Sequence, residues 1–476
     1  MLNKFNFNIF LIFFCFQIAL IGQQKQAVSI TFKDPSFKTN MYYLAGYYGK
    51  YTVLLDSTKA NLKGEINFKK NKKYTEGIYM LVNADKQIVT EFIIDKQQQF
   101  SISLNLEHPD KTTIENSETN TRFFEFNTLL KQNNLQIQEL TKQLATATTN
   151  KGSAHIKGKI STLNKSIITY KSNIIQKDPD NVLSLLFNLS KPIEHYFNEV
   201  TLATKKDSLT YLKDHFFEGI NFNDERLLRN PFLETKITTY FNALVPKDPE
   251  SITKEVFTIL NNTGDKNNSM FSYLSIFFAN TYANPKVMGN DRVFINIYNN
   301  YFKDKTYSWL TEQQKIFLNT TNSHRKDNLI GNKAKNLFMT TIDGKTLNLY
   351  DVSSPYTVVI FWDPSCGHCI KELPKINKWY LKDLKSRGVK IYAVNLNPDL
   401  KKEWIDFIEK EQLSDWIHVT PTKVVYGDYS KEEVDFQTLY NVVQTPVMYL
   451  LDSTKTFRAK NISVENYINI INQLQP

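Results

Sequence analysis

The chain has 476 residues, 22% of them charged and 41% hydrophobic, which is typical of globular proteins. At about 150 residues per domain, this length suggests about three domains, each large enough to bury its own core. The 15 glycines and 15 prolines are too few for a collagen-like or disordered chain, and 3 cysteines are too few for a disulfide scaffold. Lys and Arg exceed Asp and Glu by 58 − 48 = 10, but the excess is spread along the chain without a run of five adjacent basic residues. We interpret it as a solvated surface and expect no nucleic-acid partner.

The N-terminus has the form of a secretory signal peptide over residues 1–22. A short basic stretch, residues 1–4, precedes the apolar residues 5–21, and Gly22 provides a small residue near which cleavage is expected. The alternative is a retained membrane anchor, although the apolar stretch is marginal for the roughly 20 residues that span a bilayer. A lipoprotein is disfavoured because Gln23 stands where the lipidated cysteine must be. We therefore expect export to the periplasm or cell envelope, with membrane association only if the segment is retained.

Three regions of different periodicity follow. Residues 23–115 contain short alternating apolar segments separated by turn signals, which predict an all-β, sandwich-like accessory domain built from antiparallel strands. Residues 116–330 show helical spacing of apolar residues and predict an α-helical domain. Its first part predicts two long antiparallel helices that form a hairpin with a break near Gly152, and Asp178 begins the next predicted helix. In residues 331–476, strand and helix patterns alternate, which predicts an α/β domain.

Cleavage of the signal peptide removes Cys15 and leaves Cys366 and Cys369 as the only thiols. Cys366 follows a buried-type strand and comes directly before a predicted helix. There, unpaired backbone N–H groups and the helix dipole favour a thiolate and lower the thiol pKa. Cys369 lies one turn into the helix, shielded but close enough to attack a mixed disulfide formed on Cys366. Between them, we expect Gly367 to permit a tight approach and His368 to stabilise the thiolate.

Other uses of the two cysteines fit less well. A zinc site needs about four ligands and only two thiols are available, so we expect no metal. Haem attachment requires a histidine directly after the second cysteine, where Ile370 stands, and no other cofactor motif is present. A purely structural disulfide across two residues closes too small a loop to stabilise the chain much. The spacing therefore favours a redox-active dithiol.

The run Phe361-Trp362-Asp363-Pro364-Ser365-Cys366-Gly367-His368-Cys369, followed by Pro374, resembles the thioredoxin superfamily. Within it, the segment is most similar to TlpA/ResA-type envelope thiol-disulfide oxidoreductases, whose long members carry N-terminal accessory domains. The resemblance implies a thioredoxin-like fold for residues 331–476 and a Cys366–Cys369 disulfide in the oxidised state. It also implies that Thr445 and Pro446 form a substrate-binding cis-proline loop, and that Trp362 and Pro364 modulate the site together with the Gly367-His368 dipeptide.

Two positions depart from the family pattern. Thioredoxin carries a buried acid in the strand before the active site, where this chain has Ile360, so the proton route of the resolving thiol is absent or supplied elsewhere. The dipeptide Gly367-His368 is the one found in protein disulfide isomerases, which shifts the reduction potential upward. The direction of electron flow therefore stays open.

The expected function is that of an exported thiol-disulfide oxidoreductase, with Cys366 as nucleophile and Cys369 as resolving thiol. Its expected partners are disulfide- or thiol-containing envelope proteins and a membrane thiol donor or acceptor. An alternative is an envelope binding or scaffold protein whose thioredoxin-like domain is regulatory or vestigial. A peroxiredoxin-type peroxidase is a further alternative, but it needs a Thr or Ser where Asp363 stands and a proline where Val359 stands.

Overall fold

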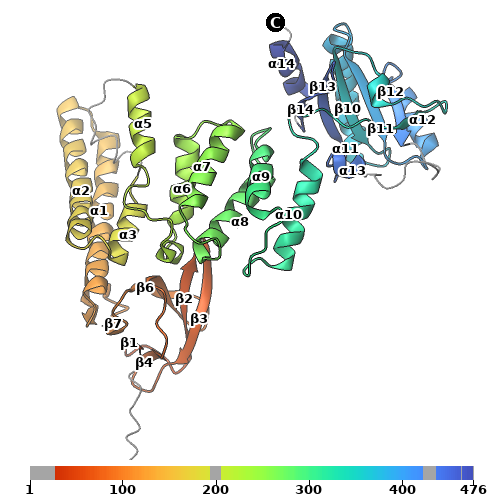
Figure 1. Ribbon diagram of the computed structural model, residues 1–476. Coiled ribbons are helices and arrows are strands. Elements are labelled where there is room, and N and C mark those ends of the chain that lie inside the picture. Colours follow the sequence, from red (N-terminus) through yellow and green to blue (C-terminus); the bar gives the residue numbers. More distant parts are fainter. Residues whose placement is uncertain (1–26, 193–204, 422–435, 462–463, 475–476) are drawn as a thin grey trace, which may run out of the picture. The chain divides into compact units, whose positions relative to one another are not determined.

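The computed structural model describes residues 27–192, 205–421, 436–461 and 464–474 (Figure 1). The predicted signal peptide, residues 1–22 with Gly22, lies outside these ranges. The chain divides into two compact units, Met1–Lys191 with Arg226–Leu233 and Pro192–Glu225 with Glu234–Pro476. The predicted fold class is confirmed, because all-β sheets, a helical region and a thioredoxin-like α/β domain follow one another along the chain. The predicted domain bounds stay predictions.

The β-rich region consists of two four-stranded sheets that share one core. Phe32 and Phe92 come from different sheets, and their ring centroids lie 4.9 Å apart. The strands are paired in the orders β4-β1-β7-β8 and β3-β2-β5-β6. Contrary to the antiparallel expectation, β1 and β7 run parallel, because β7 reaches β1 after strands of the other sheet and not through a hairpin. The bounds are β1 (Val28–Lys33), β2 (Met41–Tyr48), β3 (Tyr51–Lys59), β4 (Glu65–Lys70), β5 (Gly77–Val82), β6 (Ile88–Ile94), β7 (Gln99–Ser103) and β8 (Thr113–Glu115).

The predicted helical hairpin is present as α1 (Glu118–Thr146) and α2 (Asn150–Lys177). The side chains of Ser117 and Thr149 cap the two N-termini, and the break between the helices covers residues 147–149. Asn133 fixes the register, since its amide donates to the Leu163 carbonyl at 2.9 Å and to the Ser166 hydroxyl at 2.8 Å.

The next helix, α3 (Val182–Leu189), begins four residues after the predicted start at Asp178. Its start is set by Asn181, whose side chain accepts the N–H of Leu183 at 2.8 Å. Phe187 of α3 packs against Phe126 of α1, with ring centroids 4.7 Å apart, so α3 closes the base of the hairpin.

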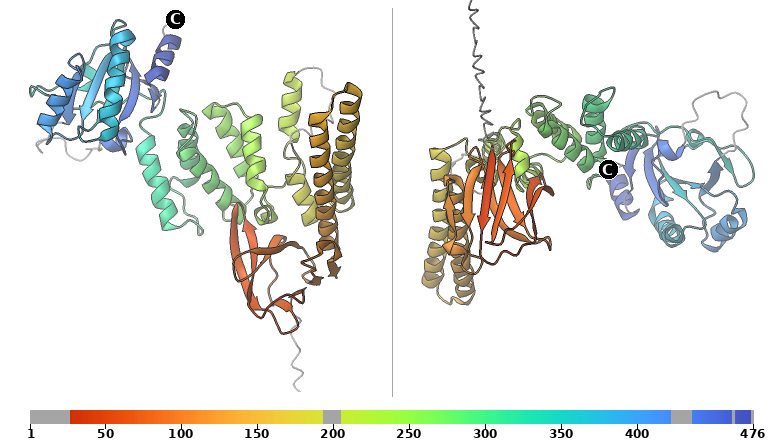
Figure 2. Two further views of the ribbon diagram at one scale, coloured as in Figure 1. Left: turned by 180° about the vertical axis from the view of Figure 1, so that it is seen from behind. Right: turned by 90° about the horizontal axis from the view of Figure 1, so that it is seen from below.

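The second unit begins with further helices that come one after another along the chain (Figures 1 and 2). Their interior is aromatic, as in the edge-to-face contact of Phe271 with Tyr301 at 5.6 Å. The helices are α5 (Lys205–His215), α6 (Leu233–Ala243), α7 (Pro249–Asn261), α8 (Ser269–Ala283), α9 (Asp291–Ile297) and α10 (Glu312–Arg325).

The C-terminal domain is built on a six-stranded sheet with the order β14-β13-β10-β11-β12-β9. Strands β10, β11 and β12 are parallel, whereas β13, β14 and β9 each run antiparallel to the neighbour nearer the centre. The strands are β9 (Met339–Thr341), β10 (Tyr356–Trp362), β11 (Lys390–Asn395), β12 (Ile417–Pro421), β13 (Val447–Asp452) and β14 (Phe457–Lys460). The helices are α11 (Gly367–Trp379), α12 (Lys401–Lys410), α13 (Phe436–Leu439) and α14 (Val464–Leu474).

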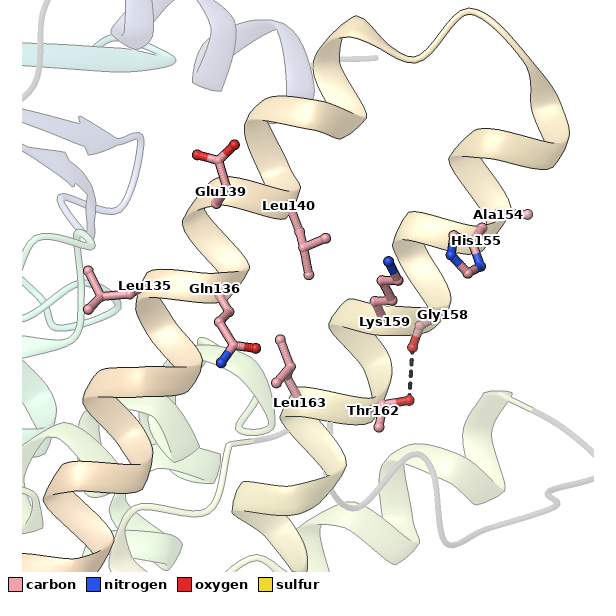
Figure 3. Close-up of a pocket in the computed structure, with 10 residues that line it drawn as sticks. All are labelled: Leu135, Gln136, Glu139, Leu140, Ala154, His155, Gly158, Lys159, Thr162 and Leu163. Carbon is pink, nitrogen blue, oxygen red and sulfur yellow. Dashed lines mark hydrogen bonds between the residues drawn. The ribbon is translucent and has the colours of Figure 1, made fainter.

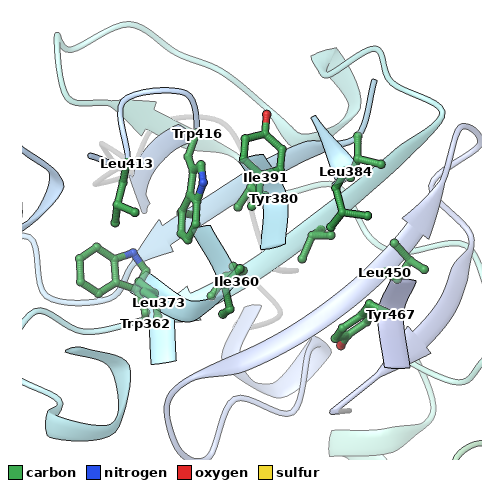
Figure 4. Packing of buried hydrophobic residues seen from close by; sticks show 14 of the residues in the cluster. Ile360, Trp362, Leu373, Tyr380, Leu384, Ile391, Leu413, Trp416, Leu450 and Tyr467 are labelled. Atoms are coloured by element: carbon green, nitrogen blue, oxygen red, sulfur yellow. The ribbon is translucent and has the colours of Figure 1, made fainter. Parts of the chain in front are cut away.

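Strand β10 is buried along its whole length, which explains its uninterrupted run of apolar residues. On one face of the sheet, Ile360 of β10 and Ile391 of β11 share a core cluster with Leu373 of α11 (Figure 4). The cluster also contains Cys369, so the helix that carries the cysteine motif is fixed to the sheet by its apolar face.

Candidate active site

A short loop between β10 and α11 presents Cys366. Asp363 shapes this loop, because its carboxylate accepts both the N–H and the hydroxyl of Ser365 at 2.7 Å. The carbonyl of Asp363 also accepts the N–H of Cys366 at 3.0 Å. Cys366 is the N-cap residue of α11, with extended backbone angles of φ −78° and ψ 111°. Its sulfur therefore lies where the unpaired N–H groups of the first helical turn point.

The surroundings of Cys366 stabilise its thiolate. Its Sγ accepts the N–H of Cys369 at 3.3 Å, and in the thiol form it donates to the carbonyl oxygen of Thr445 at 3.4 Å. Partial burial acts to raise the pKa of Cys366, but hydrogen bonding by Cys369, by the side chain of Thr445 and by the backbone of His368 lowers it and outweighs the burial. The pKa of Cys366 therefore lies below its ordinary value of 9.0, in the direction expected for a nucleophile at a helix N-terminus.

Cys369 has the opposite character. It is fully buried in the core cluster, and burial, followed by its hydrogen bond with Cys366, raises its pKa to about 12. Both residues are free thiols in the structure, so the predicted disulfide between them stays a prediction. The pair thus combines one acidic, half-exposed thiol with one protected thiol that stays protonated near neutral pH.

The predicted modulating residues differ in their surroundings. Gly367 and His368 are exposed, and a Cβ added at Gly367 meets no atom within 4 Å. The space beside Gly367 is therefore open among the described residues, and its expected role in permitting a tight approach stays a prediction. Pro364 is buried, and Trp362 is fully buried with its ring 5.4 Å from that of Phe407. Trp362 thus contributes to the core beneath the motif.

The loop before β13 forms the other side of the site. The bond between Thr445 and Pro446 is cis. The next residue, Val447, pairs with Phe361 across the antiparallel β10–β13 ladder, which brings the Thr445 carbonyl beside Cys366. Two residues that are 79 positions apart in the sequence therefore meet because β10 and β13 are neighbours.

Sequence reasoning missed the polar support of the loop. The Asn397 amide lies 3.5 Å from the Asp363 carboxylate, and Asn395 accepts the N–H of Asn397 at 2.9 Å. Asn395 ends β11, which is parallel to β10, so the carboxyl ends of the two strands meet at one edge. The two asparagines at the end of a buried strand and two residues beyond it, Asn395 and Asn397, were the signal that could have revealed this support. Among the described residues, no group of three or more His, Cys, Asp or Glu side chains is placed to hold a metal ion.

Two parts of the chain match known families. Residues 330–460 match the AhpC/TSA family, and residues 194–328 match a domain of unknown function, DUF5106. The thiol-disulfide oxidoreductase ResA of Bacillus cereus is 29% identical over 101 residues, which are 21% of this chain and 57% of that relative. The chain therefore spans little more than half the length of this curated relative.

Solved structures also align with the chain. A domain of a possible thiol-disulfide isomerase from Cytophaga hutchinsonii is 38% identical, covers 31% of this chain and 93% of its own length, and has a TM-score of 0.27. A thioredoxin-like protein from Bacteroides caccae is 18% identical, covers 58% of this chain and 95% of its own length, and has a TM-score of 0.44.

Proposed function

We propose that this chain, whose residues 330–460 form a thioredoxin-superfamily domain of the TlpA/ResA type, exchanges disulfides with other proteins through Cys366 and Cys369. The observation that carries the proposal is the environment of the Cys366 sulfur. It is half-exposed at the N-cap of α11, accepts the Cys369 N–H at 3.3 Å and has a lowered pKa, while the buried Cys369 lies one turn away. A half-exposed thiolate next to a protected thiol is the arrangement that two-step exchange requires.

The reaction follows from the two acidities. The Cys366 thiolate attacks one sulfur of a substrate disulfide, forming a Cys366–substrate bond and releasing the other substrate sulfur as a thiolate that takes a proton from water. Cys369 then loses its proton and attacks Cys366, which forms the Cys366–Cys369 disulfide and releases the second substrate thiol. The substrate gains two electrons from the enzyme and two protons, one from water and one from Cys369, so a thiol donor must reduce the enzyme before the next cycle.

The lowered pKa of Cys366 ensures that a nucleophile is present near neutral pH. The raised pKa of Cys369, about 12, keeps this thiol protonated until the mixed disulfide forms. In the mixed disulfide, the Cys366 sulfur is no longer a thiolate, so it no longer raises the pKa of Cys369. This change favours deprotonation of Cys369 in the second step.

We further propose that the exchange takes place in the periplasm or cell envelope. The form of residues 1–22 supports export, and an oxidising compartment supplies disulfide-containing substrate proteins. The redox partner would be a membrane thiol donor when the enzyme reduces its substrates, as in the reaction above, and a membrane thiol acceptor when exchange runs in the opposite direction. Once Cys15 is removed with the leader, no third thiol in the chain competes with the active pair.

Peroxide reduction is the other chemistry compatible with a match to the AhpC/TSA family. A peroxidatic cysteine needs a hydroxyl three residues before it, and this chain has Asp363 there. The position that would need a hydroxyl therefore carries a carboxylate, and this carboxylate accepts hydrogen bonds from the N–H and hydroxyl of Ser365. Disulfide exchange is therefore the better-supported chemistry.

Two matched variants test the proposal in an insulin-reduction assay with dithiothreitol. Cys366→Ser should abolish the acceleration of insulin reduction and form no mixed disulfide. Cys369→Ser, an equal change three residues away, should instead accumulate covalent complexes with insulin when dithiothreitol is left out, and dithiothreitol added afterwards should release them. Acceleration by Cys366→Ser at the wild-type rate would refute the proposal and favour the scaffold alternative.

A further inference from the structure

The helical hairpin collects most of the excess positive charge of the chain. Residues 127–177 contain eight lysines and one acidic residue, Glu139, which gives 8 − 1 = +7 of the net charge of +10. The expectation that the excess is spread along the chain is therefore wrong. Lys171 is partly buried, and Lys177 lies 3.5 Å from Glu118. The remaining lysines are exposed and have no ion-pair partner within the described ranges: Lys131, Lys142, Lys151, Lys157, Lys159 and Lys165.

An open groove of about 1070 Å³ runs between α1 and α2 on this hairpin (Figure 3). Leu140 of α1 and Leu163 of α2 point into the space between the helices and are only half-buried. Beyond Asn133, α1 has no fully buried residue, and in α2 the single fully buried residue is Ile174, near the base. Among the described residues of its own unit, no third layer of the kind that normally covers such a stripe packs on the apolar seam of the outer hairpin. The groove is lined by Leu135, Gln136, Glu139, Leu140, Ala154, His155, Gly158, Lys159, Thr162 and Leu163.

Helical spacing places lysines along both walls of the groove. On α2, residues 151, 155, 158, 162 and 165 repeat every three or four positions and so share one face. Three of these positions line the groove, so Lys151 and Lys165 stand at the two ends of its α2 wall, and Lys159 lies between them. On α1, Lys131 and Lys142 flank Leu135 and Glu139 in the same way.

We infer that this groove binds an amphipathic helix of another protein, with an apolar face for the seam and acidic residues along both flanks. The lysine rows extend over 11 residues of α1 and 14 of α2, about 16 and 21 Å at 1.5 Å per residue, which suits a helix of about 12–14 residues. A third helix fits between two antiparallel helices as it does in a bundle. The inference is independent of the dithiol.

Two other occupants fit the hairpin less well. A second copy of the chain would bring its own residues 127–177, also with a net charge of +7, against the first, so lysines would face lysines, which opposes association. A flat anionic membrane could contact the lysines, but the apolar residues lie on the floor of a groove between two helices. Burying that floor requires a convex partner, and a helix with apolar and acidic faces supplies both the shape and the charge.

The test uses the purified protein and a fluorescein-labelled synthetic helix of about 18 residues, with leucine at every third and fourth position and glutamate on both flanks. Fluorescence anisotropy should show binding at least about tenfold tighter than for the same peptide with lysine in place of glutamate. Lys159→Glu should weaken binding about fivefold. Lys157→Glu is the matched control. It makes the same charge change two residues away, about 200° around the helix and outside the groove, and should weaken binding less than about twofold.

Gly158→Leu tests the groove itself. A Cβ at Gly158 meets no atom within 4 Å, and leucine has a higher helix propensity than glycine, so the helix should persist while the groove is filled. Binding should fall at least about tenfold with the circular dichroism spectrum unchanged. Equal weakening by the two lysine variants, or unchanged binding to Gly158→Leu, would overturn the inference. So would binding to vesicles of equal parts phosphatidylcholine and phosphatidylglycerol without binding to the peptide, or self-association through the hairpin in analytical ultracentrifugation.

Discussion

Iodoacetamide should alkylate Cys366 and spare Cys369 when it is added to the reduced protein at pH 7. The reagent reacts with thiolates, so the rate at each site follows the ionised fraction. With a pKa of about 12, Cys369 is ionised in about one molecule in 10⁵ at pH 7. Cys366, whose pKa lies below 9.0, is ionised in more than about one molecule in 100. The acidities alone therefore predict that Cys366 is alkylated more than about 10³ times faster than Cys369. The burial of the Cys369 sulfur increases this ratio further.

The alkylation rates of the two cysteines should depend on pH in different ways. As the pH rises, the Cys366 rate should climb and level off with a midpoint below 9.0, because its thiolate is stabilised by hydrogen bonds in the folded protein. The Cys369 rate should keep rising through pH 10, since burial holds its pKa near 12. Mass spectrometry with fragmentation separates the two modified sites, which lie in one tryptic peptide.

The control is the same reaction in concentrated urea, where the two cysteines should react at similar rates. Similar rates in the folded protein, or a Cys366 midpoint at or above 9.0, would refute the reasoning from helix position and burial. A spared Cys369 together with a normal Cys366 midpoint would show that burial acts as described but that the helix N-terminus does not.

Three further predictions concern the framework of the site. Asp291→Ala should lower the free energy of unfolding, measured in urea, by about 3–5 kcal/mol, because the buried ammonium of Lys460 loses its ion-pair partner. A change below about 1 kcal/mol would show that the fold does not depend on this ion pair. Leu373→Ala should lower the free energy of unfolding by about 2–5 kcal/mol, because it leaves a cavity beneath α11. It should also speed the alkylation of Cys369, which lies in the same core cluster. An unchanged free energy of unfolding together with an unchanged alkylation rate would contradict this packing. Gly367→Ala should change the free energy of unfolding by less than about 0.5 kcal/mol, since the space beside it is open, and a loss above about 2 kcal/mol would show a clash.

The local geometry of the two cysteines could be predicted from the sequence because its signals are local. The continuous apolar run of β10, the Cys366 position directly before a helix and the one-turn spacing to Cys369 all lie within 14 residues, Tyr356–Cys369. Boundaries are less accurate, because capping residues decide them. Asn181 delays the start of α3 beyond Asp178.

Features that depend on long-range pairing were not predictable in this way. The parallel β1–β7 pair joins strands about 70 residues apart, and nothing in either strand specifies its partner. The amide of Asn397 supports the Asp363 loop only because β10 and β11 are adjacent and parallel. The net charge of the hairpin can be counted in the sequence, but its lysines lie along two walls of one groove only because α2 folds back along α1.

The edge of the C-terminal sheet shows why the helical region matters to the thioredoxin-like domain. An exposed edge strand invites pairing with other chains, and β14 is one edge of this sheet. Here Phe457 of β14 exchanges backbone hydrogen bonds of 2.9 Å with Gly331 and Asn332, so the segment that leaves the helical region protects the strand.

At the end of the same strand, the Lys460 N–H lies 3.3 Å from Met288 Sδ, and its ammonium is buried against Asp291 and Asn328. The buried ammonium is stable only while these helical-region partners are in place, because burial lowers the pKa of Lys460 and an unpaired buried charge is costly. Strand β14 is separated from β10 by β13, and Cys366 stays half-exposed. The helical region therefore closes one edge of the sheet while the thiol stays accessible for exchange.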